Sequence, residues 1–307
     1  KDLGTVAHSG TREFAAKLKE AKDKGDLNLI GQFGVGFYSS YLVADRIEVV
    51  SRAAGSQKAN RWSSDGKDSF EIEPAERAEA GTSVVLHLKP ELDEYLEGYR
   101  LRELVRRYSD FISYKIELSV TSQKDGEVTT SFEIINQASA LWMRPKKDIT
   151  EDQYEELYKH VTQDYEAPLG RIHFQVEGTQ MFTGLLYVPK HPPFDMFSAE
   201  RKHGVQLYVR RVFIMAECEE LLPRWLRFVR GVIDSDDLPL NVSRELLQDS
   251  VIVRTIRKQV IRRVLELLGE IAEQRPDDYL EFFRKFGSVL KEGLHFDPSY
   301  KDKLGKL

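Results

Sequence analysis

The spacing of hydrophobic residues predicts helices near both ends of the chain. Phe14, Leu18 and Ala21 recur at helical intervals within residues 11–21, with charged residues between them. Toward the other end, residues 251–273 carry one apolar stripe, which is typical of a helix with a single buried face. The residues of this stripe are Ile252, Ile256, Val260, Val264, Leu268 and Ile271.

Four further helices are predicted from weaker patterns. A helix should begin at Pro276, because the first helical position does not need a backbone N–H. Its expected core face consists of Phe282, Phe283 and Phe286. Amphipathic patterns predict helices over residues 101–112 and 150–163, and a short apolar helix should end near Ala44.

Alternation of side chains predicts strands between these helices. Within residues 82–88, Val84, Leu86 and Leu88 fall on one face, which is the period-2 signal of a half-buried strand. Segments of the same kind predict strands at residues 46–51, 60–64, 69–72, 82–88, 115–120, 171–176, 183–188 and 205–215.

The polar segment 121–130 is the predicted boundary between two domains. It is rich in charged and hydroxyl residues and contains the turn signal Asp125-Gly126. A length of 307 residues also favours two domains over one. We therefore expect a first domain over residues 1–120, a linker over 121–130 and a second domain over 131–307. The order of strands and helices indicates an α/β (α+β) fold that ends in helices.

Composition narrows the possible classes of protein. Hydrophobic residues make up 41% of the chain and charged residues 31%, as in soluble globular proteins. The net charge of −5 gives no basic field for nucleic acid, and no apolar run is long enough to span a membrane. The single cysteine, Cys218, excludes an internal disulfide and fits a reducing, cytoplasmic setting. Its acidic neighbours argue against a reactive thiolate, and the scattered histidines predict no metal site.

The glycine-rich stretch around Gly31, Gly34 and Gly36 is the first candidate for chemistry. Such glycines let backbone N–H groups approach a phosphate, and a helix follows. The same glycines could simply permit a tight turn. The spacing fits neither a dinucleotide fingerprint nor a P-loop, since no Gly-Lys-Ser/Thr follows.

Three other segments each leave two interpretations open. Residues 4–11 are either a loop with a helix N-cap or a mobile segment that closes over a ligand. In residues 238–249, Arg244 and Gln248 share a helix face, and Arg244 could join a surface ion network or reach a γ-phosphate. Residues 192–197 are either packed under their neighbours or an exposed apolar contact surface.

Four motifs in a fixed order decide between these interpretations. They are residues 4–11 (GTVAHSGT), 30–39 (IGQFGVGFYS), 207–214 (LYVRRVFI) and 238–250 (LPLNVSRELLQDS). Together they strongly resemble the bacterial members of the ninety-kilodalton heat-shock (Hsp90) family of molecular chaperones. The resemblance covers essentially the whole chain.

This resemblance implies a fold and a function. Residues 1–120 are similar to the C-terminal half of an ATP-binding domain, an α/β sandwich of the gyrase, histidine-kinase and MutL type. Residues 131–307 are similar to the family's middle domain. The implied function is ATP-dependent chaperoning of unfolded or partly folded client proteins in the cytoplasm, with ATP and magnesium as cofactors. The implied parent is a homodimer, joined through a C-terminal domain that this sequence lacks.

The resemblance also implies roles for individual residues. The phosphates would be held by the glycine loop and the adenine would lie near Thr82, while Arg244 would contact the γ-phosphate with Gln248 beside it. The implied nucleotide-binding set is Asp2, His8, Ser9, Gly10, Gly31, Gln32, Gly34, Val35, Gly36, Phe37, Thr82 and Arg244. Asp2 and His8 depart from the family, which usually has Asn and a Lys or Arg there. Phe194, Met196 and Phe197 would belong to an apolar client surface.

Two alternatives to an ATP-dependent chaperone remain for the activity of this chain. The family's general-base glutamate and its magnesium-binding and adenine-binding residues would precede this sequence, so we expect these 307 residues alone not to turn over ATP. The chain could then act as a non-catalytic client-binding module. It could also belong to another ATPase of the gyrase, histidine-kinase and MutL superfamily, although the motif at residues 238–250 argues against this.

Overall fold

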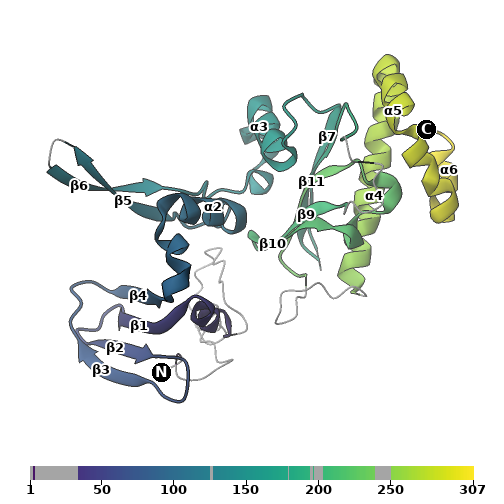
Figure 1. Ribbon diagram of the computed structural model, residues 1–307. Helices are drawn as coiled ribbons and strands as arrows, with labels where there is room; N and C mark the ends of the chain where they lie inside the picture. Colours follow the sequence, from purple (N-terminus) through teal and green to yellow (C-terminus); the bar gives the residue numbers. More distant parts are fainter. Residues whose placement is uncertain are drawn as a thin grey trace. The chain divides into compact units, whose positions relative to one another are not determined.

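The computed structural model describes residue 3 and residues 34–124, 127–178, 180–193, 196, 203–238 and 250–307. It divides into two compact units, Lys1–Glu103 (unit 1) and Leu104–Leu307 (unit 2). Both units contain helices and mainly antiparallel strands (Figure 1). The predicted mixed α/β class is therefore confirmed.

Unit 1 is built on a four-stranded antiparallel sheet with the order β3-β2-β1-β4. Its described elements are the 3₁₀-helix η2 (Gly36–Leu42), β1 (Ala44–Arg52), β2 (Ala59–Ser64), β3 (Glu71–Ala75), β4 (Gly81–Leu88) and the 3₁₀-helix η3 (Pro90–Leu96). The helix α2 (Gly98–Tyr108) runs across the boundary into unit 2. All four predicted strands of this region are present, with ends shifted by at most three residues.

The small core of unit 1 explains why β1 was easy to predict. Ile47 and Val49 alternate with half-buried or exposed residues and are themselves buried. They pack with Ala44 and Trp62, and the half-buried rings of Phe37 and Tyr41 add to this cluster. One apolar face of the strand is enough to produce the period-2 pattern.

Unit 2 begins with a separate two-stranded ribbon, β5 (Glu117–Lys124) and β6 (Glu127–Ile134). The two strands pair without interruption from Glu117 opposite Ile134 to Lys124 opposite Glu127. The described residues of the predicted linker 121–130 thus lie in strands, and the two compact units divide earlier, after Glu103. A two-stranded ribbon can expose both faces to water, so its polar composition did not distinguish it from a linker.

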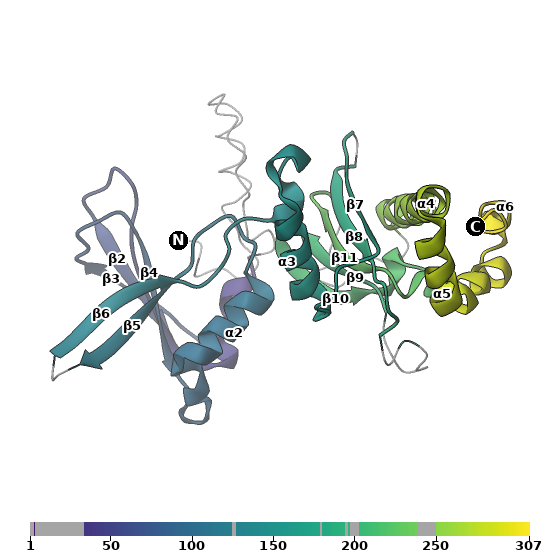
Figure 2. The ribbon, with the colours of Figure 1, turned by 90° about the horizontal axis from the view of Figure 1, so that it is seen from above.

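A five-stranded sheet with the order β10-β9-β11-β8-β7 forms the centre of unit 2. Its strands are β7 (Gly170–Val176), β8 (Phe182–Val188), β9 (Val205–Val209), β10 (Val212–Cys218) and β11 (Arg230–Ser235). β11 is parallel to β9, and the other neighbouring pairs are antiparallel. Helices α3 (Glu151–Thr162) and α4 (Val251–Gln274) lie on opposite faces of the sheet (Figures 1 and 2). Every residue of β8 is buried between these layers.

The helices of unit 2 begin and end where local chemistry favours it. Thr150 forms a capping box with Gln153 at the start of α3, and Gln163 ends the helix in the left-handed conformation with φ 58°. Pro276 occupies the first turn of the next helix, as predicted. The remaining elements are α5 (Pro276–Phe296), α6 (Lys301–Leu304) and the 3₁₀-helices η4 (Leu141–Met143), η5 (Lys146–Asp148), η6 (Glu219–Leu221), η7 (Arg224–Leu226) and η8 (Pro298–Tyr300).

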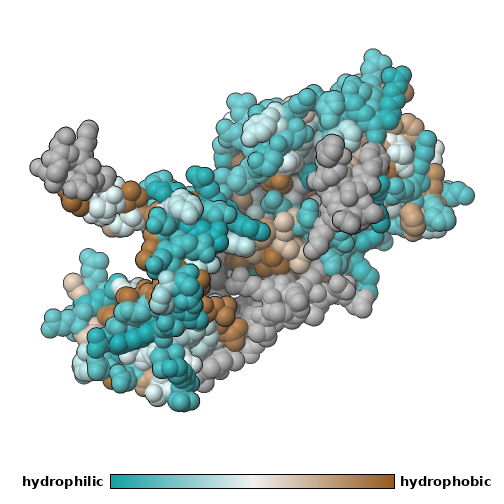
Figure 3. All heavy atoms as spheres, in the orientation of Figure 1, coloured by the Kyte–Doolittle hydropathy of each residue, from teal (hydrophilic) through white to brown (hydrophobic). Residues whose placement is uncertain are grey.

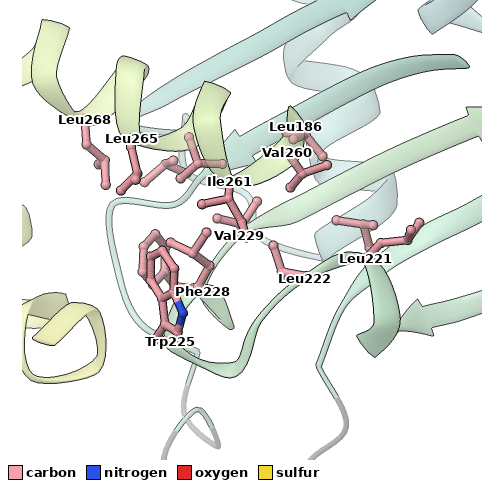
Figure 4. Packing of buried hydrophobic residues seen from close by; sticks show 14 of the residues in the cluster. Leu186, Leu221, Leu222, Trp225, Phe228, Val229, Val260, Ile261, Leu265 and Leu268 are labelled. Atoms are coloured by element: carbon pink, nitrogen blue, oxygen red, sulfur yellow. The ribbon is translucent and has the colours of Figure 1, made fainter. Parts of the chain in front are cut away.

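The predicted apolar stripe of α4 packs against the sheet. Five of its six residues are buried, and Ile252 at the start of the helix is half-buried. Val260, Leu265 and Leu268 contact a cluster that contains Trp225 and Phe228 (Figure 4). On the face shown in Figure 3, hydrophilic residues cover most of the described surface of unit 2, which accounts for the high content of charged residues.

The predicted single strand at residues 205–215 is wrong, because the chain turns back within it. Arg210 and Arg211 have φ of 51° and 66° and connect β9 to β10. Two successive positive φ angles are typical of a tight hairpin turn, in which Asn and Gly are the usual residues. Here tertiary contacts support the turn: the N–H of Arg210 donates to Ser235 O (3.3 Å), and the N–H of Arg211 donates to Asp234 Oδ1 (3.2 Å).

Candidate functional site

The end of the glycine-rich loop leads directly into η2. Gly34 has φ 66°, a conformation that glycine adopts without strain, and Val35 is the N-cap of the helix. The N–H of Tyr38 donates to Val35 O (3.1 Å), so the first two N–H groups of η2, those of Gly36 and Phe37, have no acceptor within the helix. A Cβ added at Gly36 would meet no atom within 4 Å. The two N–H groups are therefore suited to an anionic ligand.

Aromatic contacts hold this helix on the sheet. The ring of Phe37 meets Trp62 edge to face at a centroid distance of 5.5 Å and meets Tyr38 at 5.6 Å. The hydroxyl of Tyr41 donates to Ser64 O (3.3 Å) on β2, and that of Tyr38 donates to the carbonyl of Leu3 (2.9 Å). These contacts fix the start of η2 relative to the sheet.

Thr82 lies on the same face of the sheet as Phe37. It is directly opposite Ser51 on β1, and the two hydroxyl oxygens are 2.8 Å apart. Ser51 shares its face with Val49, which lies opposite Trp62, the residue that Phe37 contacts. Because directly opposite residues of an antiparallel pair share a face, η2 and Thr82 are brought to one side of the sheet.

Comparison with known proteins adds an independent observation. The model of the family described as "Hsp90 protein" matches residues 122–307. The chain belongs to the Hsp90 family. The whole chain also aligns with curated bacterial proteins named chaperone protein HtpG, at 58% identity for Myxococcus xanthus, 54% for Bordetella avium and 51% for Halorhodospira halophila.

These relatives are considerably longer than the chain. The alignments cover 100% of this chain but 48% of the Myxococcus protein, 49% of the Bordetella protein and 50% of the Halorhodospira protein. The chain thus spans about half the length of the curated Hsp90-family relatives that it matches.

Several predicted site residues of this Hsp90-family chain lie outside the described residues. They are Asp2, His8, Ser9, Gly10, Gly31, Gln32, Arg244 and Gln248. The structure describes Gly34, Val35, Gly36, Phe37 and Thr82, all in unit 1. The roles of both groups in nucleotide binding stay predictions.

The apolar segment 192–197 is partly described. Met196 is 2% exposed, its N–H donates to Pro193 O (3.0 Å), and its carbonyl accepts from Arg227 Nε (3.2 Å). Met196 is therefore packed under its neighbours and does not belong to an exposed client surface. Phe194 and Phe197 lie outside the described residues.

Neither a metal site nor a membrane-spanning helix is found in the part of the chain that the structure describes. The described residues contain no group of three or more His, Cys, Asp or Glu side chains placed to hold a metal ion. Among them, no helix is both long enough and apolar enough to cross a membrane.

Sequence analysis missed a second group of polar residues, which lies in unit 2. Tyr154 on α3 and His173 on β7 are hydrogen-bonded (2.8 Å between Tyr154 Oη and His173 Nδ1), and Arg171 on β7 binds Glu151 on α3. The sequence predicts the helix at residues 150–163, and the capping-box pattern at Thr150 marks its start. Nothing in the sequence indicated that this start lies against β7.

Proposed function

We propose that this Hsp90-family protein acts as an ATP-dependent molecular chaperone that binds unfolded or partly folded client proteins. The observation that carries the proposal is the pair of N–H groups of Gly36 and Phe37, which have no acceptor within η2 and lie on the same side of the sheet as Thr82. The printed name of the curated relatives, chaperone protein HtpG, supports the chaperone part.

The proposed roles of the site residues are those that the Hsp90 family implies. The backbone of residues 34–37 would donate hydrogen bonds to the phosphates of ATP, and Thr82 would lie near the adenine. Arg244 would approach the γ-phosphate, where a guanidinium stabilises the charge that spreads over the phosphoryl oxygens, with Gln248 beside it. Bound magnesium would neutralise phosphate charge, and its ligands are not among the described residues.

The partners of the protein follow from the same proposal. Client proteins bind as substrates, the working form is a homodimer, and the setting is the cytoplasm. The net charge of −5 favours proteins over nucleic acid as partners. The Hsp90 match favours a chaperone over a gyrase, sensor kinase or MutL-type ATPase. We expect these 307 residues alone to bind partners without hydrolysing ATP.

Two glycines provide a matched test of the nucleotide site. Gly34 (φ 66°) lies in the proposed phosphate loop, and Gly55 (φ 77°) lies between β1 and β2 with nothing within 4 Å of an added Cβ. Both substitutions by alanine place a side chain at positive φ, so each should cost roughly 1–2 kcal/mol of stability. Only Gly34→Ala should weaken ATP binding, by about tenfold, which corresponds to about 1.4 kcal/mol. Titration calorimetry of both variants with ATP measures the difference between their affinities.

Each part of the proposal has its own contrary result. Equal ATP affinities of Gly34→Ala and Gly55→Ala would show that the glycine loop does not contribute to ATP binding. Arg244→Ala should abolish phosphate release by the full-length protein while ATP still binds, and undiminished release would exclude the role of Arg244. Failure of the full-length protein to suppress aggregation of a heat-denatured model protein would contradict the chaperone function.

A further inference from the structure

A cavity of about 600 Å³ lies at the free edge of the sheet in unit 2. Strand β7 is the last strand of the described sheet, and the cavity opens where this strand meets the start of α3 and the end of α4. Residues that line it include Lys146, Tyr154, Leu169, Arg171, Leu267 and Arg275. The volume falls within the roughly 300–1,000 Å³ typical of small-molecule sites.

One wall of the cavity is a stack of charged and aromatic groups. The two terminal nitrogens of Arg171 donate to the two carboxylate oxygens of Glu151, each at 2.5 Å. The same guanidinium lies 4.1 Å above the centre of the Tyr154 ring. The fork geometry of this pair fixes Arg171 and largely cancels the charge of Glu151.

The inner end of the cavity is neutral and fully hydrogen-bonded. His173 Nε2 lies 2.9 Å from the carbonyl oxygen of Trp142, so it must carry the proton, and Nδ1 then accepts from the hydroxyl of Tyr154 at 2.8 Å. The hydroxyl of Tyr187 donates to Tyr154 O (2.8 Å). Burial lowers the pKa of His173, which favours this neutral form. The donors of His173 and Tyr187 are thus already used.

An unpaired ammonium lies at the rim. The side chain of Lys146 forms no hydrogen bond or ion pair with the described residues, whereas Arg275 donates to Leu169 O (2.9 Å) and pairs with Asp278 at 3.3 Å. The ion pairs Arg171–Glu151 and Arg275–Asp278 leave Lys146 and Glu155 as the charged lining residues without an ion pair among the described residues. The unpartnered ammonium of Lys146 is the group best able to bind an anion.

The cavity also has an apolar side. The buried side chain of Leu169 and the half-buried side chain of Leu267 line it beside the ring of Tyr154. A ligand in the cavity can therefore place an apolar part against these side chains and an acceptor group at Lys146.

We propose that this cavity binds an organic carboxylate with an apolar body. The carboxylate contacts Lys146 at the rim, and the apolar part lies against Tyr154, Leu169 and Leu267. Two sources share this chemistry: a free small acid, or an acidic side chain of a chain segment that lies along β7. The site lies in unit 2 and does not rest on the proposed nucleotide function.

The test compares an acid with its neutral isostere. Titration calorimetry of the full chain with 3-phenylpropionate and with 3-phenylpropionamide separates the charge from the apolar body. We expect the acid to bind about tenfold more tightly, a difference of about 1.4 kcal/mol. Lys146→Gln should remove this difference. Lys147→Gln changes the neighbouring exposed lysine, which does not line the cavity, and should leave it unchanged.

A filling variant tests the location of the site. Ala167 lines the cavity and is half-buried. Because a tryptophan side chain at this position would fill the cavity, Ala167→Trp should weaken the binding of both ligands. Competition by an acetylated peptide with an internal glutamate, but not by its glutamine counterpart, would assign the carboxylate to a protein partner. Competition by neither peptide would assign it to a free acid.

Three results would overturn the proposal. The first is equal affinity for the acid and the amide. The second is that Lys146→Gln and Lys147→Gln reduce the preference for the acid over the amide equally, which would indicate a general effect of surface charge. The third is the absence of binding at millimolar ligand in a chain whose circular dichroism melt shows it to be folded.

Discussion

The indole of Trp142 donates a hydrogen bond to the carboxylate of Asp234, with 2.9 Å between Nε1 and Oδ2. The two residues are 92 positions apart and are only 1% and 3% exposed. The other carboxylate oxygen accepts from the N–H of Arg211 in the β9–β10 turn (3.2 Å). Burial raises the pKa of Asp234, and these hydrogen bonds oppose that shift. One buried carboxylate thus connects η4, β11 and the turn.

Substitution of the two buried tryptophans of unit 2 should isolate the strength of this bond. Trp142→Phe and Trp225→Phe remove the same atoms from side chains that are each 1% exposed, but Trp225 Nε1 has no hydrogen-bond partner among the described residues. We expect Trp142→Phe to be more destabilising by about 1.5–3 kcal/mol, the range for a hydrogen bond to a charged group. Urea unfolding curves of the two variants give the difference. Equal losses would show that Asp234 finds another donor.

Two glycines should separate backbone strain from steric overlap. Gly231 on β11 and Gly178 after β7 have φ of 132° and 141°. A Cβ at Gly231 would lie 2.2 Å from Leu185 O, whereas a Cβ at Gly178 would meet nothing within 4 Å. Gly178→Ala should cost roughly 1–3 kcal/mol from strain alone. Gly231→Ala should cost about 1–3 kcal/mol more because it overfills a packed sheet. Thermal melts compare them, and similar midpoints would mean that β11 shifts without penalty.

The elements that could be predicted are those with one buried face. α4 shows an apolar stripe in the sequence because Ile256, Val260 and Val264 all belong to the hydrophobic core that the helix forms with the five-stranded sheet. The β9–β10 turn was missed because Arg210 and Arg211 lack the usual turn chemistry. Their conformation depends on hydrogen bonds to Asp234 and Ser235, which follow more than 20 residues later. A local pattern cannot contain that information.

The two candidate sites also differ in how far the sequence could predict them. The glycine loop is one continuous segment, so its pattern was visible, although the pattern alone also allowed a simple tight turn. The cavity of unit 2 combines Lys146 on η5, Arg171 on β7, Leu267 on α4 and Arg275 after it. These residues become neighbours only when both helix layers pack on the sheet, so no spacing in the sequence could predict them.

The stability of unit 2 should fall on mild acidification because of His173. Its pKa is lowered by burial, so below about pH 6.5, the usual pKa of histidine, the unfolded chain binds more protons than the folded one. The contribution of His173 is therefore present above that pH and is lost as the pH falls toward the lowered pKa. His203, whose pKa is also lowered by burial, adds to the trend. Urea unfolding between about pH 5 and 7 measures the slope.

A histidine variant separates this effect from general acid sensitivity. His173→Asn should reduce the slope and leave the part due to His203, at the cost of the hydrogen bonds to Tyr154 and Trp142. His295 is exposed at the end of α5, so His295→Asn should leave the slope intact. An unchanged slope in His173→Asn would mean that the folded state accommodates the charged imidazole.

Cys218 should report on the opening of unit 2 without any substitution. It is 0% exposed, and burial together with the nearby carboxylate of Glu220 raises the pKa of its thiol to about 12. At pH 8 the thiolate population should then be roughly a thousandfold below that of an unperturbed cysteine, even before access is considered. The sequence contains no other cysteine, so one thiol reagent follows one site. We expect labelling of the folded chain to be limited by unfolding and to accelerate in parallel with the loss of structure in urea. Rapid labelling in the absence of urea would show that β10 opens locally, because the thiolate reacts only when Cys218 reaches water.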